Sequence, residues 1–390
     1  MKFPRIISLF LAALLLAGCG TAPAEPTSAA ATLPPETTLP AETEAPISEL
    51  DALLEGMTLR QKVGQLFIVR PEALDPAGST VLTDAMIAAL EEYPVGGIVM
   101  FARNIESPEQ ITAFNQELRD FSGIPPFLSV DEEGGAVARL ANNAAFDLPR
   151  YKNAASIADA AQALEMGSAI GGYLKGYGFN MDFAPVADVN TNPDNPVIGT
   201  RAFSAEASAA AELAGAMAGG LNSQGIIAVF KHFPGHGDTA EDSHAGIAVS
   251  YKTADEMRQC EWLPFLEADS GDCVMVGHIA VPEITGSLIP ATMSREIVMD
   301  ILKEELGFEG LVITDALEMG AVTESYTPGE GALAALKAGC DILLMPADLR
   351  EAFDAVVSAV EEGTYSETKL DETVRRILAF KAAHGILWLE

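Results

Sequence analysis

The sequence predicts an α/β protein whose folded part is a single (β/α)8 barrel of the TIM type, preceded by a signal peptide and a disordered tether. Short apolar runs rich in β-branched residues recur eight times after residue 60, and helical stretches lie between most of them. Parallel strands covered by helices on both faces are apolar along their whole length. Eight strand–helix units can close into a barrel, and a doubly wound open sheet is the alternative.

Residues 1–18 are predicted to be a secretion signal. Lys2 and Arg5 precede an apolar run over residues 6–16, which is too short to span a membrane as a mature helix. The run ends in the letters LAGC at Cys19, and this motif resembles a bacterial lipobox. The resemblance implies a lipoprotein signal peptide, a lipidated Cys19 and an extracytoplasmic protein anchored to the cell membrane by its lipid alone. An ordinary signal peptide with a chance cysteine is the alternative.

Residues 19–47 are predicted to be the lipidated cysteine and a flexible linker. From residue 20 to 46 the chain consists almost wholly of Ala, Thr, Pro, Glu and Ser, a composition that buries nothing and stays extended. Residues 48–390 form the predicted barrel. This length exceeds that of most single domains but suits a (β/α)8 barrel with long loops.

The apolar runs and the stretches between them give the order of elements. The eight predicted strands are Val63–Val69, Val95–Phe101, Phe127–Asp131, Phe179–Val186, Ile226–His232, Cys273–Val281, Leu311–Asp315 and Asp341–Met345. The predicted helices, rich in Ala, Leu and Glu with apolar positions three and four apart, are Pro108–Phe121, Ala158–Leu174, Ala205–Leu221, Ala254–Ala268, Arg295–Leu306 and Gly329–Ala338. A closing helix over Lys369–His384 is expected to pack across the barrel.

The composition excludes several classes of function. The formal net charge of −33 would repel a phosphate backbone, so nucleic acid is not an expected partner. Four cysteines at irregular spacing fit neither a disulfide framework nor a zinc cluster.

Ionisable residues gather where the predicted strands end. The third strand ends in DEEGG at 131–135, the fifth in Lys231-His232, the sixth at His278 and the seventh at Asp315. The carboxyl ends of the strands of a (β/α)8 barrel form the face that holds the active site. A single polar residue at a strand end commonly caps a helix or forms a hydrogen bond within a loop. Several such residues on one face of the barrel predict an active site.

The densest motif is KHFPGHGDTAEDSH at residues 231–244, which holds three of the five histidines. His232 and His236 stand four residues apart, as zinc ligands do on a helix. Pro234 and Gly235 lie between them and prevent a regular helical turn. The motif therefore predicts a loop above the barrel in place of a metal site.

This motif, together with VDEEGGAVARL at 130–140 and VITDALEM at 312–319, resembles the NagZ-like β-N-acetylglucosaminidases of glycoside hydrolase family 3. The similarity covers essentially residues 50–390. It implies a catalytic (β/α) barrel, no cofactor and no metal. It also implies hydrolysis of terminal β-linked N-acetylglucosamine, with net retention through a covalent glycosyl-enzyme.

The resemblance also assigns residues. It implies that Asp315 is the nucleophile, that His244 is the general acid and base, and that Asp242 orients His244. The substrate-binding residues that it implies are Asp131 and Arg139 at the non-reducing end of the sugar, Arg201 near the acetamido group, and Lys231 and His232. Residues of second rank are Asp188, His278 and Met345, and His236 and Asp238 are expected to shape the loop.

The residue types fit this chemistry. A retaining hydrolase needs a carboxylate that attacks the anomeric carbon and a second group that protonates the leaving oxygen and then activates water. Asp315 can attack. Imidazole titrates near neutrality, and a carboxylate such as Asp242 can fix the tautomer of His244 and favour its charged form.

The leading hypothesis is a lipid-anchored exo-β-N-acetylglucosaminidase acting on cell-wall muropeptides or related amino-sugar fragments. A β-glucosidase of the same family, a phosphorylase in which phosphate replaces water, and a sugar-binding lipoprotein without turnover are the alternatives. The sequence leaves the aglycone, the oligomeric state and the choice between hydrolysis and phosphorolysis open.

Overall fold

The computed structural model describes residues 48–78, 80–240 and 246–389. The predicted signal peptide, the predicted lipidation site Cys19 and the predicted linker lie outside the described residues. The chain from Ile47 onwards forms one compact unit. None of the helices in the three described ranges is long and apolar enough to cross a membrane.

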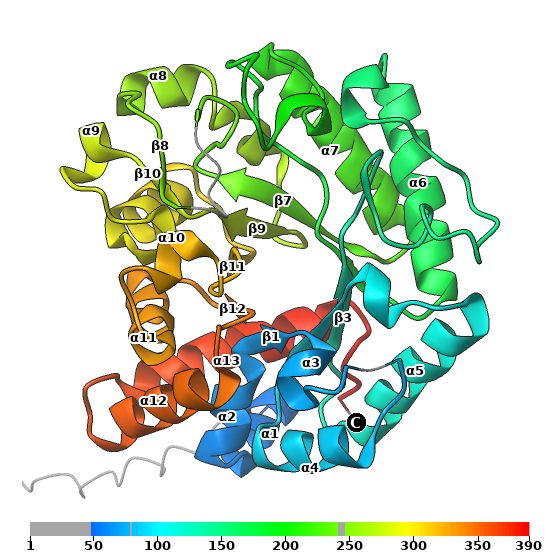
Figure 1. The fold of residues 1–390 in the computed structure, drawn as a ribbon. Helices are drawn as coiled ribbons and strands as arrows, with labels where there is room; N and C mark the ends of the chain where they lie inside the picture. Colours follow the sequence, from blue (N-terminus) through cyan, green and yellow to red (C-terminus); the bar gives the residue numbers. More distant parts are fainter. Residues whose placement is uncertain (1–47, 79, 241–245, 390) are drawn as a thin grey trace, which may run out of the picture. The chain divides into compact units, whose positions relative to one another are not determined.

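Eight parallel strands form a nearly closed barrel at the centre of Figure 1, and helices surround it. The strands are β1 (Phe67–Val69), β2 (Gly97–Met100), β3 (Phe127–Val130), β6 (Met181–Asp182), β7 (Ile227–Phe233), β9 (Cys273–Val276), β11 (Leu311–Thr314) and β12 (Leu343–Leu344). Their order around the sheet is β11, β9, β7, β6, β3, β2, β1, β12. The predicted (β/α)8 class is confirmed.

The ring closes at a seam between β11 and β12, where the structure has one isolated parallel bridge in place of a ladder. The Thr314 N–H donates to Ile342 O at 3.0 Å. In the same direction, the Val312 N–H donates to Asp341 Oδ2 at 2.9 Å. In the other direction, the N–H groups of Asp341 and Ile342 donate to Val312 O at 2.8 and 3.1 Å, and the Leu344 N–H donates to the Thr314 hydroxyl at 3.0 Å. Backbone and side-chain oxygens therefore both serve as acceptors along this seam.

Helices follow or precede the strands on the outside of the ring. They are α1 (Glu49–Gly56), α2 (Leu59–Gln65), α3 (Pro71–Leu74), α4 (Asp84–Glu92), α5 (Pro108–Phe121), α6 (Ala160–Gly176), α7 (Ala207–Ser223), α8 (Ala254–Gln259), α9 (Pro282–Thr285), α10 (Gly320–Thr323), α11 (Pro328–Ala338), α12 (Leu349–Glu361) and α13 (Glu367–Ala383). A π-helical segment, η6 (Glu296–Glu305), covers the barrel between β9 and β11.

Short additional pairs of strands lie outside the ring. β4 (Glu132–Gly134) and β5 (Val137–Ala138) are antiparallel, whereas β8 (Ala248–Val249) and β10 (Ile279–Ala280) are parallel. Gly134 ends β4 and Gly135 begins the turn to β5, and their φ values of 86° and 62° lie in a region that favours glycine.

Several predicted boundaries were wrong. The first strand begins at Phe67 and not at Val63, because Thr58 and Gln61 form a capping box that starts α2, and α2 buries Val63 on the barrel. The run Cys273–Val281 splits into β9 and β10. The predicted helix Ala254–Ala268 splits into α8 and a 3-10 segment.

The predicted fourth strand, Phe179–Val186, is reduced to the two residues of β6. Pro185 has no N–H to donate to a ladder, so regular pairing ends before it. Val186 regains a single bridge to Lys231.

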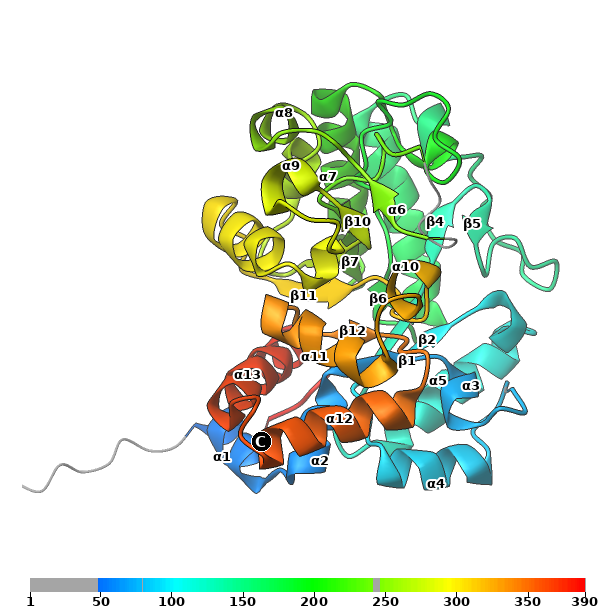
Figure 2. The ribbon, with the colours of Figure 1, turned by 60° about the vertical axis from the view of Figure 1, so that its left-hand side comes forward.

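The predicted closing helix is α13, which packs against α1 and α2 (Figure 2). It carries Lys381, a fully buried lysine. Its ammonium group donates to Gln65 Oε1 at 2.8 Å and to Gly96 O at 2.9 Å, and lies 4.8 Å from the centroid of the Phe127 ring. These partners precede β1 and β2 or start β3, so α13 covers the amino end of the barrel.

Candidate active site

A cavity of about 450 Å³ opens at the carboxyl end of the barrel, and each of the eight strands, or the segment directly after it, contributes to its wall. Six sequence-predicted site residues line it together: Asp131, Arg139, Arg201, Lys231, His232 and Asp315. The structure therefore brings together, around one cavity, residues that are up to 184 positions apart in the sequence, as the strand-end pattern predicts.

Carboxylates and cations alternate on the β3 and β7 side of the cavity. Lys231 Nζ lies 2.8 Å from Asp131 Oδ1 and 2.6 Å from Glu133 Oε1. Arg139 reaches the other oxygen of Asp131 at 3.3 Å. Arg201 donates to both oxygens of Glu133, from Nε at 2.9 Å and from Nη2 at 2.7 Å. The result is a continuous network of ion pairs with one bidentate pair.

This network keeps its members ionised. Burial raises the pKa of Glu133, but Lys231 and Arg201 outweigh it and lower the pKa to about 2. Burial likewise disfavours the charged forms of Asp131 and Lys231, yet their mutual attraction lowers the pKa of Asp131 and raises that of Lys231. The wall thus presents fixed charges at neutral pH, which can hydrogen-bond the hydroxyls of a sugar as donors and acceptors.

Glu132 holds this wall in place. Its carboxylate accepts the backbone N–H groups of Arg139, Leu140 and Ala141 at 2.6 to 2.9 Å, and the Tyr173 hydroxyl at 2.8 Å. Burial raises the pKa of Glu132 despite these donors. Because the side chain faces away from the cavity into this set of donors, Glu132 fixes the hairpin that carries Glu133 and Arg139.

Asp188 holds the loop that carries His232 and His236 from the side away from the cavity. This buried carboxylate lies 2.8 Å from Nδ1 of His232 and accepts the His236 N–H at 2.7 Å. A carboxylate partner requires Nδ1 of His232 to carry a proton, which leaves Nε2 for the cavity. Gly237 passes so close that a Cβ atom there would lie 1.9 Å from Val189 O. The loop can therefore take this course only with glycine.

Asp315 is the first residue after β11 and is partly exposed to the cavity. Its Oδ1 accepts the N–H of Ala316 at 2.8 Å. Burial raises the pKa of this carboxyl, but the rings of His232 and His278 and the Ala316 N–H outweigh burial, and the pKa lies below its ordinary value. Asp315 is therefore an ionised carboxylate with access to the cavity, as a nucleophile requires.

His278 lies behind Asp315 and is fully buried. Its Nε2 is 2.9 Å from Ala316 O, and its Nδ1 is 2.8 Å from the Thr292 hydroxyl. A carbonyl can only accept, so Nε2 carries a proton. This second-rank residue thus supports the backbone after Asp315 and does not line the cavity.

The predicted acid–base pair, Asp242 and His244, lies outside the described residues. The structure describes both stems of their loop. In one stem, Asp238 accepts from the Ser250 hydroxyl of the other stem at 3.2 Å and pairs with Lys252 at 3.4 Å. The β8–β10 ladder ties the second stem to the segment after β9. Both stems are thus joined at the carboxyl end of the barrel.

Sequence reasoning missed three ionisable groups of this cavity: Arg70, Arg103 and Glu318. Glu133 was collected in the strand-end motif DEEGG but received no role of its own. Arg70 directly follows β1, so the same strand-end pattern would have found it. Arg103 and Glu318 stand three and four residues beyond strand ends, too far for the strand-end pattern to select them, although Glu318 belongs to the VITDALEM motif.

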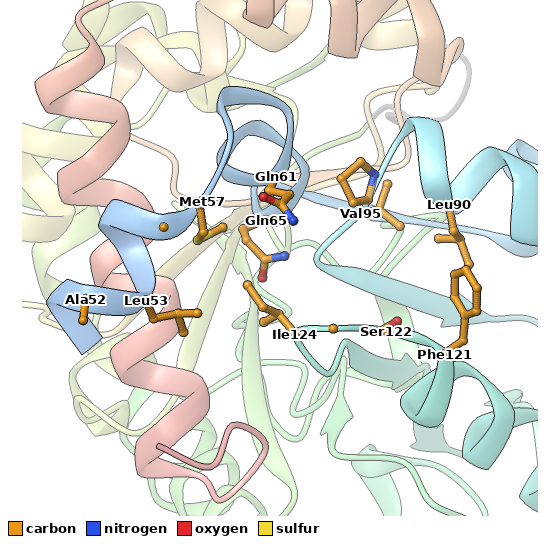
Figure 3. A pocket seen from close by; sticks show the side chains of 13 residues that line it. Ala52, Leu53, Met57, Gln61, Gln65, Leu90, Val95, Phe121, Ser122 and Ile124 are labelled. Atoms are coloured by element: carbon orange, nitrogen blue, oxygen red, sulfur yellow. The ribbon is translucent and has the colours of Figure 1, made fainter. Parts of the chain in front are cut away.

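A second hollow, of about 390 Å³, lies at the opposite end of the barrel between α1, α2, α4 and α5 (Figure 3). Leu53, Met57, Leu90 and Ile124 contribute to its apolar wall, and Gln61 and Gln65 are among its polar groups. None of its lining residues is ionisable, so it offers no acid, base or nucleophile.

Comparison with known proteins agrees with an active site at the carboxyl end of the barrel. Residues 58–380 match the family described as glycosyl hydrolase family 3 N terminal domain. The beta-hexosaminidase LpqI of Mycobacterium tuberculosis is 31% identical over 397 residues, with 98% of each chain covered. Beta-hexosaminidase A of Pseudoalteromonas piscicida is 32% identical over 339 residues, covering 78% of this chain and 56% of that protein.

A solved structure is similar as well. The family 3 β-N-acetylglucosaminidase from Paenibacillus sp. str. FPU-7 superimposes with a TM-score of 0.79 at 37% identity, covering 85% of this chain and 63% of that one. The chain thus spans somewhat more than half of the length of the Pseudoalteromonas and Paenibacillus proteins.

Proposed function

Because the chain belongs to glycosyl hydrolase family 3, we propose that it is a retaining exo-β-N-acetylglucosaminidase, which removes terminal β-linked N-acetylglucosamine. One observation carries the proposal: Asp315, ionised and open to the cavity, faces a wall of paired carboxylates and cations. The names of the hexosaminidase relatives support the choice of sugar.

The proposed reaction has two displacements. An oxygen of Asp315 forms a bond to the anomeric carbon while the glycosidic C–O bond breaks, and protonated His244 gives its proton to the leaving oxygen. Neutral His244 then takes a proton from water, whose oxygen attacks the anomeric carbon and releases Asp315. Asp242 holds His244 in the required tautomer. His244 and Asp242 enter this scheme from their sequence motif alone.

We assign sugar recognition to the charged wall. Asp131, Arg139, Lys231 and His232 hold the hydroxyls of the non-reducing end, and Arg201 lies near the acetamido group. Each guanidinium or ammonium donates and each carboxylate accepts, so a sugar ring meets both kinds of partner. Glu133 orients Arg201 and Lys231 for this purpose.

Three measurements test the proposal. The protein should hydrolyse p-nitrophenyl N-acetyl-β-glucosaminide faster than the β-glucoside, and phosphate should not alter the product. Proton NMR should show the β-anomer first. A 5-fluoro N-acetylglucosaminyl donor should label Asp315, as mass spectrometry of peptides can show. A glycosyl phosphate product would identify a phosphorylase instead. Inversion, or a label on another residue, would refute the assignment of Asp315.

We further propose that Cys19 is lipidated and anchors the enzyme outside the cell, where muropeptides are the substrate source. The lipobox motif supports this. Cys19→Ala should move the protein from the membrane fraction to the soluble fraction without changing its specific activity. A Cys19→Ala protein that stays in the membrane fraction would exclude the anchor.

A further inference from the structure

We propose that a hollow on the outside of the barrel, at the amino ends of β11 and β12, is an anion site that binds a phosphate group. The hollow has about 370 Å³ and lies between η6, α11 and α13. The segments that lead into β11 and β12, at residues 308–310 and 339–340, complete its wall. No described residue lines both this hollow and the active-site cavity. It is therefore a separate site, and the inference goes beyond the proposed function.

Among the described residues, five basic and two acidic side chains line this cationic hollow. The basic residues are Arg295, Lys303, Lys337, Lys369 and Arg376, and the acidic residues are Glu309 and Glu372. Over the whole chain the ratio is reversed, with 56 acidic and 23 basic residues. At physiological salt, exposed charges are screened beyond about 8 Å. A ligand in the hollow therefore meets the local cations and not the net charge of the protein.

A buried carboxylate beneath the hollow holds two of these cations in place. Asp341 is fully buried and accepts from Lys303 Nζ at 2.9 Å and from Nη2 of Arg376. Lys303 also donates to Gly339 O at 2.9 Å. The side chain of Arg376 is 45% exposed, and its Nε and Nη1 donate to no atom that the structure describes. Asp341 therefore balances one of two positive charges and leaves N–H groups of a fixed guanidinium for a ligand.

The remaining cations are weakly neutralised. Arg295 pairs with Asp300 at 3.5 Å. Lys337 and Lys369 are exposed, and neither forms an ion pair within the part of the chain that the structure describes. Glu372 stands three residues after Lys369 on α13 but is not paired with it. Like charges gathered around one space repel each other, so an anion that enters the hollow relieves this repulsion.

The arrangement suits a phosphate group better than a carboxylate. Lys303, Lys337 and Lys369 come from three different helices and approach the hollow from different sides. A carboxylate has two oxygens in one plane, which match a single guanidinium, whereas the tetrahedral oxygens of a phosphate can meet several cations at once. The volume is within the range of small-molecule sites and leaves room for a small alcohol, such as glycerol, esterified to the phosphate.

Two sources can supply this group, a phospholipid headgroup and a soluble phosphate ester. The helix α13, which carries Lys369 and Arg376, is also joined to α1, the first helix of the folded unit, by an ion pair between Arg375 and Asp51. The chain that leads from Cys19 therefore enters the barrel beside a helix of the cationic hollow. The lipid source rests on the proposed anchor at Cys19, whereas the soluble source does not.

The test uses the full chain with Cys19→Ala, so that no covalent lipid contributes to binding. Lys337→Gln combined with Lys369→Gln removes two exposed charges of the hollow. Lys152→Gln combined with Lys175→Gln removes the same charge from exposed positions outside the hollow and is the matched control. Hydrolysis of the p-nitrophenyl glycoside should be equal in all these proteins, which shows that they are folded.

Binding is measured with two phosphate probes. Calorimetry with glycerol 3-phosphate tests the soluble ester, and flotation with phosphatidylglycerol vesicles, against phosphatidylcholine vesicles, tests the headgroup. We expect the hollow variant to bind about 10- to 30-fold more weakly than the parent protein, since two cationic contacts are lost. The control variant should change less than threefold. Acetate should bind more weakly than the phosphate ester.

Binding of either probe that depends on the two lysines supports the site. Binding of the vesicles alone assigns the lipid headgroup, and binding of glycerol 3-phosphate alone assigns a soluble ester. Binding of neither probe, equal losses in the two variants, or acetate bound as tightly as the phosphate ester would overturn the inference. Because no sugar is present in these measurements, an inactive protein that binds phosphate would keep the site and reject the proposed hydrolase.

Discussion

The two ends of the barrel each bury a lysine, and the two lysines differ in their partners. At the carboxyl end, Lys231 lies between Asp131 and Glu133, which outweigh its burial and raise its pKa. At the amino end, Lys381 has only neutral acceptors, and burial lowers its pKa to about 7. The first is held as a cation that can meet a ligand, whereas the second joins α13 to the barrel.

Two aspartates repeat the contrast. Asp315 and Asp341 both have lowered pKa values against the effect of burial. Asp341 is fully buried and meets Lys303 at 2.9 Å and also Arg376, whereas Asp315 has no cationic side chain in an ion pair within the described residues and is open to the cavity. At the amino end, the carboxylate of Asp341 is paired with cations of the same chain. At the carboxyl end, the carboxylate of Asp315 remains available to a substrate.

Asp315→Asn should give the largest effect on activity. The amide keeps the shape of the side chain but cannot attack the anomeric carbon, so kcat should fall by roughly 10⁴-fold or more. Thermal unfolding should remain near that of the wild type. Steady-state kinetics with a natural disaccharide checks this, and turnover within tenfold of the wild type would remove Asp315 from the reaction.

Asp341→Asn should lower the stability of the protein and leave its activity unchanged. It leaves two cations at the seam without their carboxylate, which should reduce the free energy of unfolding by about 3 kcal/mol. Activity per folded molecule should stay unchanged, because Asp341 does not line the cavity. Urea denaturation and active-site titration measure the two effects. Lost turnover with normal stability would show that the two ends are not separate in function.

Lys231→Met should come next. It removes the cation that Asp131 and Glu133 share, so kcat/KM should fall by about 100-fold, largely through weaker sugar binding. The control is Lys175→Met at an exposed position of α6. Because Lys231 lowers the pKa of Glu133, the acid limb of the pH profile of kcat/KM should also move to higher pH. An unchanged acid limb would contradict this role for Lys231.

Lys381→Met should have a smaller effect that depends on pH. The unfolded chain keeps the Lys381 proton up to about pH 10.4, whereas the folded protein releases it near pH 7. Between these values the unfolded chain binds more protons, so the contribution of Lys381 to stability rises with pH by at most about 1.4 kcal/mol per unit. Urea denaturation should therefore show that the free energy of unfolding of the methionine variant exceeds that of the wild type most strongly near pH 6. This difference should shrink toward pH 9. A constant difference would mean that Lys381 keeps its proton.

The sequence predicted the barrel because buried parallel strands are apolar throughout, and this signal is strong even in strands of two to four residues. It could not separate Val63 in α2 from the strand that starts at Phe67, because both segments are buried and apolar. The helices α1 to α4, α9, α10 and α12 were not predicted; five of these seven have fewer than nine residues.

In the cavity, Asp131 and Asp315 were found because active-site residues of a barrel commonly follow the carboxyl ends of its strands. This pattern could not show that Asp188 and Glu132 act from behind the wall, because their roles depend on long-range contacts with His232 and Tyr173. Nor could it find the hollow at the amino end, whose walls come from α1, α2, α4 and α5.

The closure between β11 and β12 bears on how the protein opens. Backbone amides that bond to side chains, such as those of Val312 and Leu344, depend on two side-chain rotamers and not on a continuous ladder. Segments with fewer cooperative backbone bonds unfold locally at lower free energy than the core. We therefore expect amide hydrogen exchange to be faster along this seam than between β2 and β3. Since Asp315 directly follows Thr314, such an opening would displace the nucleophile first, and heat would inactivate the enzyme before it melts the barrel.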